Sequence, residues 1–218
     1  NGSGKTTMIN VITGIYRAEG GSVALRGTAI HQQASFEIAS SGVARTFQNI
    51  NLVDDMDVLD NVAVARYGFE KAGLAQAISA GWNEAEWQRA RAQAAGLLGA
   101  LGIAHTAHTR AGGLAYGIKR KVEIARALAL EPSLLLLDEP AAGLNEDEQR
   151  DLADRLRAFA KRGLSILVIE HNMPFLMPLA QRMICLDHGV VIAEGTPAEI
   201  RANPLVVAAY LGVPEEVT

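Results

Sequence analysis

The sequence predicts an α/β protein with a mainly parallel sheet and helices packed on it. Two segments, LLLLDEP at 134–140 and SILVIEH at 165–171, are apolar until they end in polar residues. Such uninterrupted apolar runs are typical of strands that are covered on both faces, as parallel strands are. The segment between them places Leu152, Leu156 and Phe159 on one face of a helix. Strand, helix and strand in this order favour a parallel sheet.

Further elements are expected along the rest of the chain. Strands are predicted at 22–27 and 43–47, where apolar residues alternate with polar ones or are branched. Residues 57–102 are rich in Ala, Gln and Arg, with apolar residues at helical spacing, and indicate a helical block. MICLDHGVVIAEG is expected to form a hairpin. A capping box that begins at Thr196 predicts the first of two short helices at the C-terminal end.

The composition is that of an ordinary globular protein. Of its 218 residues, 49% are hydrophobic and 20% are charged, which is typical of an ordered chain. The net charge of −4, with thinly spread basic residues, leaves no basic face for a phosphate backbone, so we expect no nucleic-acid partner. The longest apolar runs are far shorter than the ~20 residues that cross a bilayer. The single Cys185 excludes an internal disulfide.

The first residues, NGSGKTT, fit the end of the phosphate-binding loop G-x-x-x-x-G-K-[ST]. Gly2 and Gly4 allow backbone amides to approach phosphate oxygens, Lys5 supplies a positive charge, and the hydroxyl of Thr6 suits Mg2+. A helix that begins at about Gly4 would direct its positive end at the same phosphates. The first glycine of the pattern would precede Asn1, so we expect the chain to be cut within this loop. The alternative is a glycine-rich turn that only caps a helix.

Two adjacent carboxylates, Asp138 and Glu139, follow the leucine run directly. In parallel sheets, ligands bind beyond the carboxyl ends of the strands. There Asp138 could hold Mg2+ while Glu139 orients and deprotonates a water molecule. Neighbouring side chains on a strand point in opposite directions, so this division requires the strand to end here, as Pro140 suggests. The alternative is a strand that surfaces at two solvated carboxylates.

Five motifs in a fixed order carry a resemblance to a known family. The motifs are GSGKTT, TFQN, LAYGIKRKVEIARAL, LLLLDEPAAGLN and ILVIEHN. Together they resemble the nucleotide-binding subunit of an ABC transporter, over essentially the whole chain. The resemblance implies a P-loop NTPase fold, a RecA-like core with a mainly parallel sheet, plus an inserted α-helical subdomain. The expected core is 1–52 and 119–195, the helical subdomain with the signature motif is 53–118, and C-terminal helices fill 196–218.

The resemblance also implies a role for each motif residue. Glu139 is the general base, His171 contacts the γ-phosphate of ATP, and Gln48 senses the metal and the attacking water. Mg2+ is expected at Thr6, Gln48 and Asp138. ATP is expected to bind the phosphate loop and the signature motif through Asn1, Gly2, Ser3, Gly4, Lys5, Thr6, Thr7, Ala115, Tyr116 and Gly117. AAGLN, 141–145, is the D-loop that communicates between two subunits.

The signature motif LAYG departs from the common family form LSGGQ. Ala115 has no hydroxyl where that form has serine, and Ile118 replaces its glutamine. Binding of the nucleotide that the opposite subunit holds must then rest on the amides near Tyr116 and Gly117 and on the helix behind them. The lost neutral hydrogen bond is worth about 0.5–1.5 kcal/mol, which weakens closure without abolishing it.

Within the family, the chain is similar to an ATPase subunit of bacterial branched-chain amino acid importers. The segments that carry this similarity are LAYG, EPAAGLN and the ending EGTPAEIRANPLVVAAYLG. This implies a subunit that binds and hydrolyses ATP to power an importer. Its expected partners are a second ABC ATPase subunit, transmembrane permease subunits and, indirectly, a substrate-binding protein, at the cytoplasmic face of the inner (plasma) membrane, where the subunit is peripheral. Alternatives are a truncated, non-catalytic remnant and an ABC ATPase of another import or export system.

The segment after Gln48 is expected to contact the membrane subunits. It offers Leu52, Val53 and Met56 where the core passes into the helical block. In ABC importers, by resemblance, this border receives a short helix of the membrane subunit, and apolar side chains are the usual anchors of such a helix. The alternative is that these side chains pack within the subunit itself.

Overall fold

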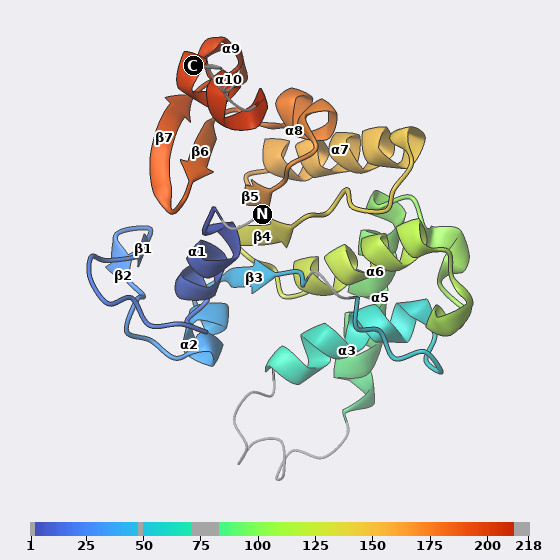
Figure 1. Cartoon of the computed structure of the whole chain (residues 1–218). Helices are drawn as coiled ribbons and strands as arrows, with labels where there is room; N and C mark the ends of the chain where they lie inside the picture. The colour runs from blue at the N-terminus through green and yellow to red at the C-terminus, as the bar shows by residue number, and fades with distance from the viewer. Residues whose placement is uncertain (1–2, 48–49, 71–82, 212–218) are drawn as a thin grey trace, which may run out of the picture. The chain divides into compact units, whose positions relative to one another are not determined.

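The computed structural model describes residues 3–47, 50–70 and 83–211 (Figure 1). The chain divides into two compact units, one made of residues 1–35 with 171–218 and the other of residues 36–170. No helix in the described ranges has the length and apolar character that a membrane span requires. The expected division into a core and a helical subdomain is based on the positions of the family motifs, not on these compact units. It stays a prediction.

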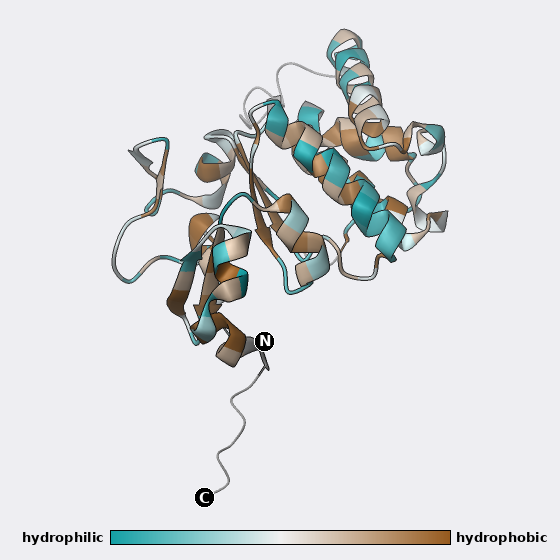
Figure 2. Cartoon of the chain, turned by 90° about the horizontal axis from the view of Figure 1, so that it is seen from above, coloured by the Kyte–Doolittle hydropathy of each residue, from teal (hydrophilic) through white to brown (hydrophobic). Residues whose placement is uncertain are grey.

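A three-stranded parallel sheet lies in the unit formed by residues 36–170. Its strands are β3 (Val43–Arg45), β4 (Leu134–Asp138) and β5 (Ser165–Ile169), with β4 in the middle. Leu135, Leu136 and Leu137 of β4 are completely buried, and the strands are brown in Figure 2 whereas the helices carry teal faces. The parallel sheet predicted from the two apolar segments is confirmed.

The helix α7 (Glu146–Lys161) connects β4 to β5 and packs on the sheet through Leu152 and Leu156, as its sequence pattern predicts. It begins at Asn145, whose side chain accepts hydrogen bonds from two backbone amides of the first turn. Glu148 completes the capping box by accepting from the Asn145 amide at 3.0 Å. This cap satisfies amides that the helix leaves without partners.

The predicted helical block is present in the described residues. It consists of α3 (Val58–Glu70) and α5 (Glu84–Ala100), while residues 71–82 lie outside the description. Both helices pack on α6 (Tyr116–Leu128), and Figure 1 shows the three side by side. The remaining elements of this part of the chain are α2 (Ser35–Ser40), η1 (Ala104–Thr106) and η2 (Ala111–Gly113).

The other unit contains α1, two hairpins and the short helices that follow them. The helices are α1 (Lys5–Ile12), α8 (Met173–Leu179), α9 (Pro197–Ala202) and α10 (Pro204–Leu211). The capping box that begins α9 is confirmed, with Thr196 and Glu199 as its two members. Met183 and Ala193, from the hairpin at 183–195, form a buried cluster with Ile200 of α9.

Tight two-residue turns close both hairpins of this unit. In the pair β6 (Met183–Asp187) and β7 (Val190–Gly195), His188 and Gly189 both have a positive φ, as such turns require. The strand predicted at 22–27 is much shorter than expected, because only β1 (Ala24–Leu25) pairs with β2 (Thr28–Ala29). Residues 26 and 27 take positive φ and turn the chain back at once.

Candidate functional site

The phosphate loop begins α1 with an unusual backbone conformation. Gly4 has φ 87°, in the left-handed region that favours glycine, and it caps the helix without a side chain. Lys5 donates a hydrogen bond from Nζ to the Ser3 hydroxyl at 2.5 Å. The amide of Gly189, in the turn between β6 and β7, donates to the Ser3 carbonyl at 3.2 Å. A backbone hydrogen bond therefore joins this hairpin turn to the phosphate loop.

This geometry suits a phosphate group. A Cβ on Gly4 would lie 3.4 Å from the Gly189 backbone, within ordinary contact, so the positive φ rather than space requires glycine there. Thr6 and Thr7 are exposed at the first turn of α1, where a helix presents its amides and the positive end of its dipole. Asn1 and Gly2, also predicted to bind nucleotide, lie outside the described residues.

Asp138 is the last residue of β4 and is almost completely buried. Its Oδ2 accepts a hydrogen bond from Arg45 Nη2 at 3.1 Å, and the two side chains are 8% and 9% exposed. The guanidinium of Arg45 also lies over the ring of Phe47, 5.2 Å from its centroid. A buried carboxylate is thus held by one cation at the edge of the sheet where ligands bind.

The strand ends between the two carboxylates, as the sequence predicts. Glu139 has φ 49°, a left-handed conformation that is unusual for a residue other than glycine. Its amide donates to the Ile169 carbonyl at 2.9 Å, and its own carbonyl accepts from the Ala142 amide at 3.2 Å. This turn takes the Glu139 side chain out of the alternation of β4 and allows it a role different from that of Asp138.

The turn after Glu139 is held by a second buried carboxylate. Glu170 follows β5 directly, and its Oε1 accepts a hydrogen bond from the Ala141 amide at 2.8 Å. The register of the sheet places Asp138 opposite Ile169, so Glu170 comes just beyond the same edge. The backbone of residues 139–141 is therefore fixed by the end of the neighbouring strand.

The signature motif lies against the D-loop. Ala115 caps α6 without a side-chain hydrogen bond, and Tyr116 begins the helix. A Cβ on Gly143, which has φ 75°, would lie 2.9 Å from Tyr116 Cε1, so the ring packs on the bare backbone of this glycine. A Cβ on Gly117 would lie 2.5 Å from Glu148 Oε1. A side chain at either glycine would therefore force the facing side chain to move.

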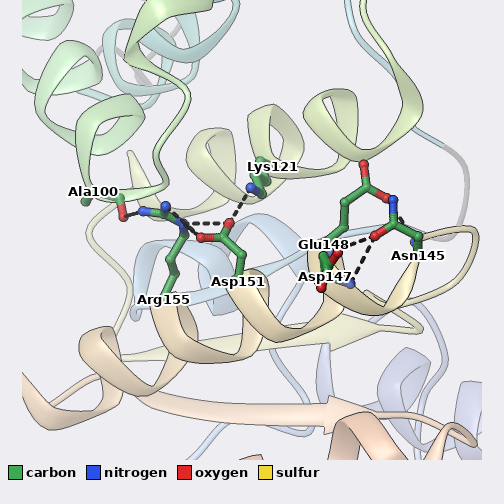
Figure 3. Close-up of polar contacts among 7 residues, drawn as sticks. All are labelled: Ala100, Lys121, Asn145, Asp147, Glu148, Asp151 and Arg155. Carbon is green, nitrogen blue, oxygen red and sulfur yellow. Dashed lines mark hydrogen bonds and ion pairs between the residues drawn. The ribbon is translucent and has the colours of Figure 1, made fainter.

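A chain of polar contacts joins α6, α7 and the end of α5, as Figure 3 shows. Lys121 Nζ donates to Asp151 Oδ2 at 2.5 Å, and Arg155 Nε donates to both oxygens of the same carboxylate at 2.8 Å. Arg155 Nη1 also donates to the Ala100 carbonyl at 2.8 Å. The hydrogen bond from Arg155, followed by that from Lys121, lowers the pKa of Asp151 despite partial burial.

Comparison with known protein families decides the identity of the fold. The family described as ABC transporter matches residues 1–142, and the family described as branched-chain amino acid ATP-binding cassette transporter matches residues 190–216. The chain belongs to the ABC transporter family. Its predicted fold class, a P-loop NTPase with a mainly parallel sheet, is thereby confirmed.

Individual ABC proteins resemble the chain over nearly its whole length. The high-affinity branched-chain amino acid transport ATP-binding proteins LivG of Salmonella typhimurium and of Escherichia coli K12 are each 39% identical over 217 residues, which cover 97% of this chain and 84% of theirs. BraF of Pseudomonas aeruginosa has the same identity and coverage. The solved ADP conformation of an ABC transporter ATP-binding cassette matches with a TM-score of 0.82 at 30% identity, covering 98% of this chain and 85% of that one.

The predicted site residues of this ABC ATPase fall in both units. The unit that contains α1 includes the phosphate-loop residues and the histidine, which are Ser3, Gly4, Lys5, Thr6, Thr7 and His171. The unit that contains the parallel sheet includes the signature residues and the two carboxylates, which are Ala115, Tyr116, Gly117, Asp138 and Glu139. His171 is exposed just before α8. Gln48 lies outside the described residues, so its predicted role stays a prediction.

Two residues that shape the site were not predicted from the sequence. Arg45 and Glu170 stand within or beside the quoted motifs, yet neither was singled out. Their signal was available in part, because a charged residue that directly follows or ends an apolar strand is expected near a ligand edge. Their partners, Asp138 and Ala141, could not be read from the sequence, since the contacts join separate strands.

Proposed function

We propose that this chain is the ATP-binding and hydrolysing subunit of a transporter that imports branched-chain amino acids. The observation that carries the proposal is the end of β4, where Asp138 stays buried in the sheet and Glu139 turns away from it. Two neighbouring carboxylates are thereby separated into one that holds a cation and one that can face a water molecule. The relatives LivG and BraF support the substrate class, since their names state branched-chain amino acid transport.

The donor set of the chain fits a nucleotide with its metal ion. The first turn of α1, with Gly4 in the left-handed region, suits phosphate oxygens, and Lys5 adds a positive charge. Thr6 and Asp138 would each offer an oxygen ligand of the kind that Mg2+ prefers. When bound, Mg2+ neutralises negative charge on the phosphate oxygens of ATP.

The residues of the chain then have distinct parts in hydrolysis. The Glu139 carboxylate accepts a proton from water, whose oxygen attacks the γ-phosphorus while the bond to the bridging oxygen of ADP breaks. His171 contacts the γ-phosphate and orients it. Glu170 and the Ile169 carbonyl hold the backbone around Glu139, so that its carboxylate is placed before the nucleotide arrives.

The proposed partners follow from the same family. Two ATPase subunits, identical or related, enclose two ATP molecules between the phosphate loop of one and the signature motif of the other. The dimer binds transmembrane permease subunits at the cytoplasmic face of the membrane, and a substrate-binding protein delivers the amino acid. The chain itself does not contact the transported substrate.

Reconstitution tests this function directly. The subunit is assembled with its permease subunits in vesicles, and ATP hydrolysis is measured with and without the binding protein loaded with leucine, isoleucine or valine. We expect hydrolysis to rise severalfold with the loaded binding protein. Hydrolysis that responds to a different solute, with no response to these three, would overturn the substrate class. An absence of hydrolysis under every condition would instead identify a non-catalytic remnant.

A further inference from the structure

Arg120 and Glu123 form a buried ion pair on α6. Arg120 is 1% exposed and Glu123 is 8% exposed, and Arg120 Nη1 donates to Glu123 Oε2 at 2.8 Å. Burial raises the pKa of Glu123, against the opposing effects of the Phe47 amide and Arg120. Removing two charges from water is costly unless further hydrogen bonds satisfy them. The other partners of this pair therefore indicate its purpose.

Those partners include the backbone of the residue that precedes Gln48 in the sequence. The Phe47 amide donates to Glu123 Oε1 at 3.0 Å, and the Phe47 carbonyl accepts from Arg120 Nη1 at 3.0 Å. Phe47 lies beyond β3, so it has left the ladder of the sheet. Its backbone amide and carbonyl are instead hydrogen-bonded to side chains of α6.

A further bond leads to the signature motif itself. Arg120 Nη2 donates to the hydroxyl of Tyr116 at 2.9 Å, and its guanidinium lies 5.6 Å from the centroid of the Tyr116 ring. The residue Tyr116 is 45% exposed, yet its hydroxyl is engaged with a buried guanidinium. The ring packs on Gly143 of the D-loop. One guanidinium thus joins the end of β3 to the motif that begins α6.

We infer that Arg120 and Glu123 are positioning residues that fix the backbone at Phe47 and the signature motif as one body, with Tyr116 as the anchor of that motif. Tyr116 stands where the common LSGGQ form has glycine, which has no side chain to engage a guanidinium. In this chain the lost serine hydroxyl at Ala115 is offset by a motif that is held in place beforehand. A displacement of the backbone at Phe47 would then displace the signature motif. A displacement of the signature motif would likewise displace the backbone at Phe47.

This inference rests on the proposed function for its consequence, which is that the signature motif is already in place when two subunits close on ATP. The variant Tyr116→Phe removes only the hydroxyl and leaves the exposed ring. In a Glu139→Gln background, where ATP remains bound, ATP-driven association is measured by sedimentation. We expect Tyr116→Phe to weaken association roughly two- to tenfold. Tyr16→Phe, an exposed tyrosine of the other unit, is the matched control and should have no effect.

Amide hydrogen exchange tests the positioning without any nucleotide. Loss of the Tyr116 hydroxyl leaves the guanidinium with one partner fewer, so we expect exchange of the Phe47 amide to accelerate roughly two- to tenfold. A purely local role of the hydroxyl would change exchange near residue 116 alone. Glu123→Gln should accelerate the amides at the start of α6 as well as that of Phe47.

The results of these experiments distinguish the positioning role from the proposed function. Unchanged Phe47 exchange in Tyr116→Phe, with a melting temperature within roughly 3 °C of the parent, overturns the positioning role. No ATP-driven association in the Glu139→Gln parent would count against the proposed function alone, since the exchange experiment does not depend on it. Equal weakening of association by Tyr16→Phe would also overturn the inference.

Discussion

Arg45 and Asp138 form a buried ion pair across two neighbouring parallel strands. The register places Arg45 opposite Leu136, two residues before Asp138, and side chains two apart on a strand lie on the same face. Their contact at 3.1 Å leaves the carboxylate neutralised by a cation of the same chain. The side chain expected to hold Mg2+ is therefore oriented by a contact within the fold.

Removing the cation should be costly. We expect Arg45→Met to lower the free energy of unfolding by about 3–5 kcal/mol, because it leaves a buried carboxylate without its partner. Urea denaturation measures this loss. Adding Asp138→Asn to Arg45→Met should restore a large part of it. Arg91→Met, which breaks the more exposed pair with Asp60, is the control and should cost about 1 kcal/mol or less. Equal losses in the two single variants would contradict the importance of burial.

The general base gives a second prediction. Glu139→Gln should leave ATP binding intact while hydrolysis falls by roughly 10² or more, because an amide cannot accept the proton from water. The variant should also accumulate as an ATP-bound dimer. Hydrolysis is measured by phosphate release in the assembled transporter, and binding by titration with a labelled nucleotide. Turnover within a factor of a few of the parent would require another base, with His171 the next candidate.

The buried side chain of Asn61 bonds to the backbone of the segment expected to meet the permease. Asn61 accepts from the Val53 amide at 2.9 Å and donates to the carbonyls of Val53 and Met56 at 3.0 and 3.2 Å. The side chains of Leu52 and Met56 are half-buried, whereas Val53 is 50% exposed. Leu52 and Met56 thus pack partly within the subunit. Val53 is the most exposed of the three apolar residues, so it best tests contact with the permease.

Val53→Asp should separate binding from stability. We expect a melting temperature within roughly 3 °C of the parent, because the residue is exposed. Co-purification with the permease subunits should fall strongly, because a charge replaces an apolar anchor. Val64→Asp, a similarly exposed valine on α3, is the matched control and should co-purify normally. Normal co-purification of Val53→Asp would place the permease contact elsewhere.

The polar chain between α6 and α7 predicts a pH dependence. The pKa of Asp151 is lowered from its ordinary value of 3.8, first by the hydrogen bond from Arg155 and also by Lys121. A lowered folded-state pKa means that the contact stabilises the fold above pH 3.8 and that this stability is lost as pH falls through the folded-state pKa. Because the carboxylate is partly exposed, its contribution is roughly 0.5–1 kcal/mol.

The measurement compares Asp151→Asn with the parent across pH. We expect the parent to melt higher at pH 7 and the difference to shrink as the pH falls below about 3.8. Asp154→Asn, which removes the more exposed partner of Arg157, should melt like the parent throughout. A difference between parent and Asp151→Asn that does not change with pH would exclude an electrostatic origin.

Much of the fold was predictable because the signals are local. Apolar runs identified β4 and β5, helical spacing identified α7, and a capping box identified the start of α9. The end of the strand between Asp138 and Glu139 also followed from adjacent residues. The strand expected at 22–27 was predicted too long, because a turn at Arg26 outweighs the strand preference of its neighbours.

The sequence alone predicted which residues carry chemistry, because motif residues within a short segment have a spacing that covalent geometry sets. Only the tertiary structure showed what holds them. Asp138 meets Arg45 because parallel strands place them on one face, and Phe47 meets Glu123 because α6 turns that side chain toward the end of β3. These contacts join residues far apart in the chain. Strand register and helix rotation, which depend on the packing of the whole unit, decide such partners.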